Sequence, residues 1–195
     1  MSTITVVRKN GVAAIAADTL TKFGGAKESA DYVVNHDKIL RVQDSYLAIT
    51  GPTTSKLILQ DFFQRQRKST RMDTVAGIFR TWLDLHEALK GRYCLRPEED
   101  EGDEFESSRM DVLIMNPGGI FGVDAFRTVQ EFARFYAYGN GACYALGAMY
   151  AAFEDPAMDA EAVARLGVSA AAEFDDSTGL PVVSHRFPLR AASAG

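Results

Sequence analysis

The sequence predicts an α+β fold in which two antiparallel sheets lie face to face between two pairs of helices. Short turn sequences separate paired β-branched, apolar runs, which indicates hairpins. These runs are apolar at nearly every position, so both faces of each sheet should be covered. Two segments with helical periodicity follow the first strands, and two alanine-rich helical segments follow the later ones. The result is a four-layer α/β/β/α sandwich.

The strands are expected mainly as hairpins. Asn10 and Gly11 join the first two runs, and both residue types tolerate the positive φ of a tight hairpin turn. Asp44-Ser45 separates the second pair, and an Asn-Pro-Gly-Gly turn at 116–119 separates the third. The segment between residues 19 and 37 is polar, and we expect a loop with one short extended piece there. The expected strands are 4–9, 12–18, 38–43, 46–50, 111–116, 119–124, much of 128–139, and 181–189.

Four helices are expected from apolar residues at helical spacing. The first covers 53–69 and begins at Thr53 or Thr54, and the second has Asp73 as its cap and an apolar face from Val75 to Leu89. The alanine-rich segments 141–155 and 160–174 have small side chains suited to close packing on a sheet. An acidic run at 97–109 is predicted to be a solvated loop.

Composition restricts the function. A length of 195 residues suits one domain, 1–195, and a formal net charge of −5 argues against nucleic acid as the main partner. No apolar run is long enough to span a bilayer, and the first residues lack the features of a secretory signal, so we expect no membrane partner and a cytoplasmic protein. Two cysteines make no disulfide framework. The three histidines show no zinc-binding spacing, and we expect no metal and no organic cofactor.

The start of the chain holds residues that could form a nucleophilic site. Ser2 opens the first strand, Asp18 ends the second, and Lys38 begins the third. Taken singly, these are ordinary residues at a terminus, a turn and a strand edge. Neighbouring strand ends can bring them together once removal of Met1 has given Ser2 a free α-amine. That amine has a pKa of about 7.7–8.0, so it can accept the hydroxyl proton at neutral pH.

The other two groups would assist this nucleophile. Lys38 would stabilise the developing alkoxide, and Asp18 would orient Lys38. The strand around Ala48 could offer a backbone N–H to the oxyanion of a tetrahedral intermediate.

These residues lie in stretches that resemble a known family. The stretches are TITVVRKNG, AIAADTLTKFG, KILR, SYLAITG, FESSRMDVLIMNPGGIFGV, AYGNGACYALGAMYAAFEDP and ARLGVSAAAEFDDSTGLPV. They resemble the proteasome β-type N-terminal-nucleophile hydrolases, and most of all the bacterial proteasome homologues. The protease partner of the HslU unfoldase is also similar. The resemblance extends over nearly the whole chain.

The resemblance implies roles for individual residues. Ser2 matches the nucleophile, Asp18 the catalytic aspartate, Lys38 the catalytic lysine, and Ala48 the place of the oxyanion N–H. Asp176, in FDDST, matches the aspartate of a supporting network. Two departures concern the nucleophile and its support: the family usually has threonine where Ser2 stands, and a serine where Asn140 stands. A further supporting serine is replaced by Thr178 or Gly179.

The resemblance also implies a function and an assembly. The function is endopeptidase cleavage of unfolded polypeptides inside a stacked double ring of identical subunits, with seven-fold symmetry favoured over six-fold. A separate ATP-dependent unfoldase is a possible partner, because the chain contains no ATP-binding loop. Two alternatives remain: a ring-forming scaffold with little or no activity, and an amidase acting on small amides. Tyr46 is expected to line the pocket for the residue that precedes the scissile bond.

Overall fold

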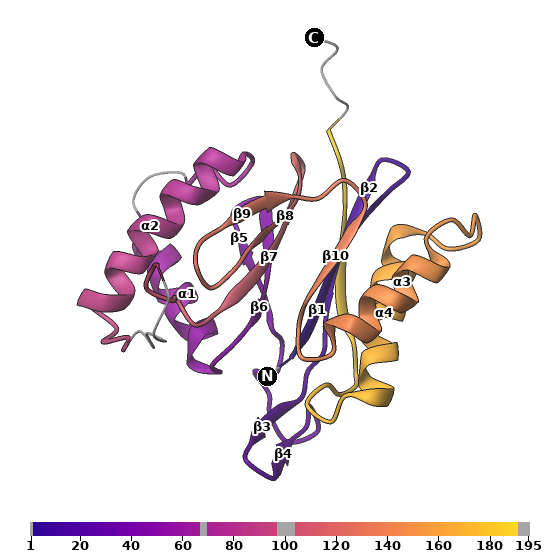
Figure 1. Cartoon of the computed structure of the whole chain (residues 1–195), viewed down its shortest axis with the longest axis horizontal. Coiled ribbons are helices and arrows are strands. Elements are labelled where there is room, and N and C mark those ends of the chain that lie inside the picture. The colour runs from indigo at the N-terminus through magenta and orange to yellow at the C-terminus, as the bar shows by residue number, and fades with distance from the viewer. Residues whose placement is uncertain (1, 67–69, 97–103, 191–195) are drawn as a thin grey trace.

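The structure, a computed structural model, describes residues 2–66, 70–96 and 104–190. Two antiparallel sheets pack face to face, one helix pair covers each outer face, and the chain begins at one edge between the sheets (Figure 1). The predicted four-layer α/β/β/α sandwich is confirmed. Among the helices of the described residues, none has the length and apolarity needed to cross a bilayer.

The first sheet contains the N-terminal strand at its centre. Its order is β10-β1-β2-β11, and every neighbouring pair is antiparallel. The predicted Asn10-Gly11 turn joins β1 to β2, and both residues have positive φ, at 51° and 74°. The strands are β1 (Thr3–Lys9), β2 (Val12–Ala17), β10 (Phe135–Gly139) and β11 (Val183–Pro188).

The second sheet has the order β5-β6-β7-β8-β9, also antiparallel throughout. The predicted second and third hairpins are its β5–β6 and β7–β8 pairs. The stretch 128–139 contributes to both sheets, because β9 ends before the chain crosses over to β10. The strands are β5 (Ile39–Val42), β6 (Ser45–Thr50), β7 (Asp111–Asn116), β8 (Gly119–Val123) and β9 (Val129–Glu131).

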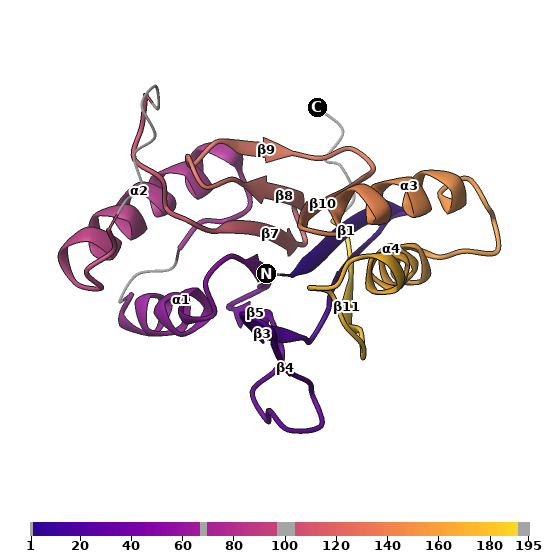
Figure 2. The same cartoon turned by 60° about the horizontal axis from the view of Figure 1, so that its bottom comes forward.

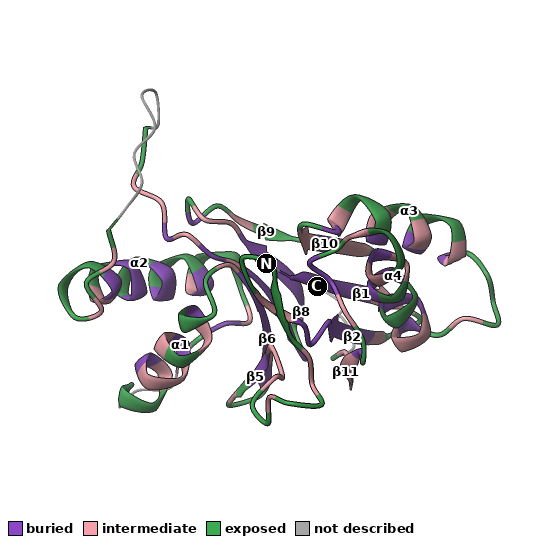
Figure 3. Ribbon diagram, turned by 90° about the horizontal axis from the view of Figure 1, so that it is seen from below, coloured by how far each residue is buried: buried purple, intermediate pink, exposed green. Residues whose placement is uncertain are grey.

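Each helix pair covers one sheet. The apolar residues of α1 and α2 pack with those of the β5–β9 sheet, and α3 and α4 pack on the β1 sheet. A third apolar cluster lies between the two sheets, whose inner strands β1, β2, β6, β7 and β8 are almost completely buried (Figure 3). The helices are α1 (Thr54–Arg65), α2 (Val75–Gly91), α3 (Ala142–Ala152) and α4 (Ala160–Phe174).

The structure differs from the expectations in a few local features. The polar segment after β2 forms a small hairpin, β3 (Thr21–Phe23) and β4 (Ala26–Glu28), which projects from the body of the molecule (Figure 2). The cap of α2 is Thr74, whose hydroxyl accepts a hydrogen bond from the N–H of Gly77, and not Asp73. Much of the predicted acidic loop, residues 97–103, lies outside the described residues.

Candidate active site

Ser2 lies at the edge between the two sheets, where β1 begins. It is 5% exposed and lines a pocket together with Lys38. Its carbonyl oxygen accepts a hydrogen bond of 3.0 Å from the N–H of Asn140, beyond the end of β10. The buried strand that follows therefore fixes the position of Ser2 from one side, and the β10–α3 turn fixes it from another.

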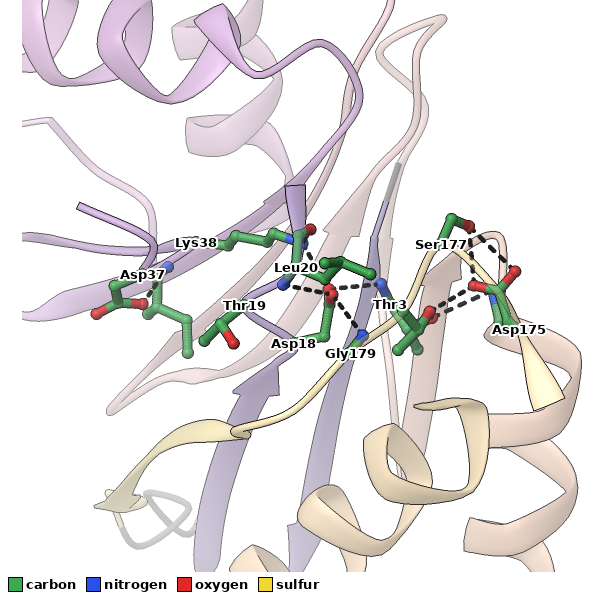
Figure 4. Close-up of polar contacts among 12 residues, drawn as sticks. Thr3, Asp18, Thr19, Leu20, Asp37, Lys38, Asp175, Ser177 and Gly179 are labelled. Atoms are coloured by element: carbon green, nitrogen blue, oxygen red, sulfur yellow. Dashed lines mark hydrogen bonds and ion pairs between the residues drawn. The ribbon is translucent and has the colours of Figure 1, made fainter. Parts of the chain in front are cut away.

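Asp18 lies near Ser2, and several hydrogen bonds hold its carboxylate in place. Its carboxylate is completely buried and accepts hydrogen bonds from four N–H groups (Figure 4). Oδ1 accepts from the Thr3 backbone at 3.0 Å and from the Lys38 ammonium at 2.8 Å. Oδ2 accepts from the backbones of Leu20 and Gly179, both at 3.1 Å. Burial raises the pKa of Asp18, while the Lys38 ammonium and the backbone N–H groups of Thr3 and Gly179 oppose that rise.

Lys38 reaches Asp18 from the start of the second sheet. Its ammonium donates to Asp18 and, at 2.6 Å, to the carbonyl of Leu20, and its own carbonyl accepts from the N–H of Ile49 at 3.2 Å. Burial lowers the pKa of Lys38, and the Asp18 carboxylate partly restores it. A lysine with a lowered pKa gives up its proton more readily than an exposed one, which suits a group that acts on a nearby hydroxyl.

A line of hydroxyl groups continues from Thr3, the residue after Ser2. The Thr3 hydroxyl lies 2.6 Å from that of Thr178, and it accepts from the N–H of Gly141 at 3.1 Å. Thr178 donates its proton to the carboxylate of Asp175. Thr3 must therefore donate to Thr178, because that hydroxyl has no second proton to give. Asp175 thus orders the hydroxyl groups directly behind Ser2.

The structure places Asp176 differently from our expectation. Its side chain is 80% exposed and forms an ion pair of 2.7 Å with Lys22. Asp175, one residue earlier, accepts from the hydroxyls of both Ser177 and Thr178. The turn that ends α4 directs these two neighbouring aspartates in different directions, so the position expected for Asp176 is occupied by Asp175.

Two residues of β6 also lie elsewhere than expected. Ala48 is completely buried within the second sheet, opposite Ile39 and Leu113, and it does not line the pocket beside Ser2. Tyr46 stacks on His185 of the other sheet, with ring centroids 4.5 Å apart, and is likewise not part of the pocket wall. The residues of this strand that do line the pocket come later, at its end: Ile49, Thr50 and the following Gly51.

Of the three remaining expected residues, Gly179 and Asn140 contribute through their main chains and Thr178 through its side chain. Gly179 donates to Asp18, and its carbonyl accepts from the N–H of Thr19. Asn140 is exposed and contacts Ser2 through its backbone N–H. Thr178 provides the hydroxyl, so of the two candidates for that place it is the one with a side-chain role.

Solved structures of two related chains cover almost the whole sequence. A Thiobacillus denitrificans BPH in complex with epoxomicin is 62% identical, with a TM-score of 0.93 over 97% of this chain and 100% of its own. Another Thiobacillus denitrificans BPH structure is 63% identical, with a TM-score of 0.93 over 96% and 98%. BPH denotes a bacterial proteasome homologue. This chain belongs to that family.

The bacterial proteasome homologues are N-terminal-nucleophile hydrolases of the proteasome type. A eukaryotic HslV from Trypanosoma brucei shares the fold at 19% identity, with a TM-score of 0.67 over 94% of this chain and 98% of its own. No profile of a known protein family matches the sequence, and a search of curated proteins finds no match. The solved structures of the two Thiobacillus denitrificans chains nevertheless confirm the resemblance inferred from the sequence.

Some functional features of this bacterial proteasome homologue were not found from the sequence. Gly139 has a φ of 102°, and a Cβ there would lie 1.9 Å from the carbonyl oxygen of Ser2. Gly51 has a φ of 125°, and its Cβ would lie 2.6 Å from the carbonyl oxygen of Arg109. The only sequence signal for either is a glycine at the end of a strand, which is too common to single them out.

Gly139→Ala should destabilise the protein by about 2 kcal/mol or more, because the new methyl group forces Ser2 and β10 apart and the backbone angle is unfavourable. Chemical denaturation of the purified variant measures this change. Gly91→Ala is the matched control. A Cβ at Gly91, the last residue of α2, meets no atom within 4 Å, and we expect a small gain of up to about 1 kcal/mol. Equal stability of the two variants would contradict the close packing around Ser2.

Asp175→Asn should lower both stability and activity, whereas Asp176→Asn should leave them nearly unchanged. The first change removes a charged acceptor from two hydroxyl groups, which costs about 1.5–3 kcal/mol. The second affects an exposed ion pair only. Denaturation curves and initial rates on one peptide compare the two variants. A larger effect at Asp176 would restore that residue to the supporting network.

Proposed function

We propose that this protein is an endopeptidase that cleaves polypeptides with Ser2 as its nucleophile. One observation carries the proposal: Ser2 lines a pocket with Lys38, whose ammonium is held by the buried carboxylate of Asp18. This arrangement unites a hydroxyl, a cation and an orienting anion at the chain terminus. Removal of Met1, which a small second residue such as serine permits, would add the free α-amine that serves as the base.

The reaction follows from these groups. The Ser2 oxygen attacks the peptide carbonyl while the α-amine takes the hydroxyl proton, and the carbonyl oxygen becomes negative. Collapse of this intermediate breaks the C–N bond, and the α-amine returns the proton to the departing amine. The acyl group remains on Ser2 as an ester. Water then attacks the ester, again with the α-amine as base, and the acid product leaves with Ser2 regenerated.

Lys38 and the end of β6 assist the charged intermediates. The Lys38 ammonium stabilises the developing alkoxide, and Asp18 keeps it in place. For the oxyanion we propose a backbone N–H near Gly51 in place of Ala48, because the end of β6 borders the pocket whereas Ala48 lies in the sheet interior.

The family supports an assembly and a substrate class. We propose a stacked double ring, seven-fold rather than six-fold, whose inner chamber limits cleavage to unfolded polypeptides. A separate ATP-dependent unfoldase would feed the chamber, and the cytoplasm is the proposed location. One solved structure of the related Thiobacillus denitrificans BPH is of its complex with epoxomicin, a peptide epoxyketone, which supports a site that accepts an extended peptide.

Degradation of one protein in two states tests this function. We expect the purified protein, at the size given by native mass spectrometry, to degrade a reduced and unfolded disulfide protein and to leave its folded, oxidised form intact. Cleavage of neither, together with cleavage of small amides, would favour an amidase instead. Cleavage of both forms would contradict the enclosed chamber.

A further inference from the structure

The pocket beside Ser2 has a second ammonium in its wall, from Lys56 in the first turn of α1. Its Nζ donates to two main-chain carbonyl oxygens, those of Asn35, at 3.2 Å, and of Asp37. In the described part of the chain these carbonyls are its hydrogen-bond partners, and its place in the wall is therefore fixed. An ammonium has three N–H groups, so one remains for a ligand in the pocket.

The position of Lys56 is unfavourable for a lysine that serves only the fold. The first turn of a helix carries partial positive charge, which repels a cation, and α1 has no acidic side chain in that turn. Burial lowers the pKa of Lys56, and the nearby Asp37 charge only partly offsets this. An anion that entered the pocket would offset both the repulsion from the helix N-terminus and the burial of the ammonium charge.

Among the described residues, the other charged groups of the pocket form no ion pair with Lys56, although the Asp37 carboxylate attracts its ammonium. The Lys38 ammonium is already paired with Asp18. Asp37 is a carboxylate in the same wall, but its Oδ1 accepts from the N–H of Ile39, at 2.8 Å, and Figure 4 shows it turned away from the Asp18–Lys38 pair. His36 also lines the pocket, and its Nδ1 contacts the carbonyl of Val33 at 2.7 Å.

The remaining wall is suited to a polar side chain. Thr21, Thr50 and Thr53 line it with their hydroxyl groups, together with the aliphatic Leu20, Ile49 and Pro52. A large apolar side chain would therefore displace water from hydroxyl and ammonium groups without replacing their hydrogen bonds. Because the pocket adjoins Ser2, the substrate side chain that enters it belongs to the residue next to the scissile bond.

We propose that this pocket selects an acidic side chain, glutamate above all, on the residue that precedes the scissile bond, and that Lys56 is the specificity-determining residue. This inference rests on the proposed function. The Lys56 ammonium would form a charge-assisted hydrogen bond with the substrate carboxylate while the adjacent carbonyl is attacked by Ser2. The substrate class is thus a peptide with glutamate, or less favourably aspartate, at that position.

The test uses two peptides that differ only by Glu or Gln before the scissile bond, with a fluorogenic amine as leaving group. The two side chains have the same shape and differ in charge. For the full-length protein, with Met1 removed, we expect kcat/KM to be at least about tenfold higher for Glu. Lys56→Met should bring the ratio close to one, and Lys56→Arg should keep a preference for Glu. The ratio is insensitive to any general loss of activity caused by a shifted Asp37–Lys38 segment.

Each other outcome is decisive. Equal or faster cleavage of the Gln peptide, or a Glu preference that survives in Lys56→Met, would overturn the role of Lys56 and leave the peptidase intact. If neither peptide is turned over, the labelling rates of Ser2 by Glu and Gln peptide epoxyketones replace kcat/KM, with the same expected ratio. Failure of both reagents to label the protein would overturn the proposed function, and this inference with it.

Discussion

Replacing Ser2 with alanine is expected to lower kcat for peptide hydrolysis by about 10³-fold or more, because the attacking oxygen is removed. Alanine is small enough for Met1 still to be removed, so the variant keeps the free α-amine and loses only the hydroxyl. The stability should change little, since the main chain of Ser2, which accepts from Asn140, is unaffected. Initial rates on a fluorogenic peptide, with the N-terminus verified by mass, measure the effect.

Ser2→Thr is the matched variant. Threonine keeps the hydroxyl, and its β-methyl group restricts χ1. We expect activity within about tenfold of the starting protein, in either direction. A Ser2→Ala protein that retained full activity would show that another residue attacks the substrate, and the account of the N-terminal site would fail.

Lys38→Met is expected to have the second largest effect, on activity and stability together. Activity should fall by about 10²-fold or more, because the alkoxide and the proton transfers lose their cation. Stability should fall by about 3 kcal/mol, because the Asp18 carboxylate stays buried without its ionic partner. Initial rates and denaturant titrations give the two quantities.

The double variant Asp18→Asn/Lys38→Met separates these two effects. Its neutral amide no longer needs an ionic partner, but the amide NH2 cannot accept from the backbone N–H groups that face both carboxylate oxygens. Only part of the lost stability should therefore return, while activity should remain low. Return of activity along with stability would mean that Lys38 has only a structural role.

The same groups predict how the rate depends on pH. Below about pH 7.7 the α-amine of Ser2 becomes protonated and cannot accept the hydroxyl proton, so the rate should fall as the pH is lowered. At high pH the Lys38 ammonium loses its proton, and because burial lowers its pKa, this fall should begin below the range of an exposed lysine. A profile of kcat/KM against pH should rise and then fall, and Lys38→Met should lack the alkaline fall.

The fold could be predicted well from the sequence, because hairpin turns and periodicity are local signals. Asn10-Gly11 identified the β1–β2 turn, and alanine-rich segments identified the helices on the first sheet. The segment 128–139 was harder, because its split between two sheets depends on partners far away in sequence. The cap at Thr74 in place of Asp73 depends on which of two adjacent polar residues has extended backbone angles.

The positions of site residues could be predicted from the residues alone where these residues lie at the ends of strands. Asp18 and Lys38 do so, and the structure joins them at 2.8 Å. Asp175 and Asp176 are identical in type and adjacent, and only the turn after α4 determines which one faces Thr178. The positions of Ala48 and Tyr46 depend on the packing of one sheet against the other, which no local pattern reveals.

The intact mass of the protein after incubation with a peptide epoxyketone tests the central claim most directly. The epoxyketone forms its ring adduct only with a hydroxyl and a free amine on the same residue, which are the two groups proposed for processed Ser2. We predict loss of Met1 and one adduct per chain, with no adduct on Ser2→Ala. Retained Met1, or complete processing without any adduct, would contradict the N-terminal serine mechanism and favour a ring-forming scaffold.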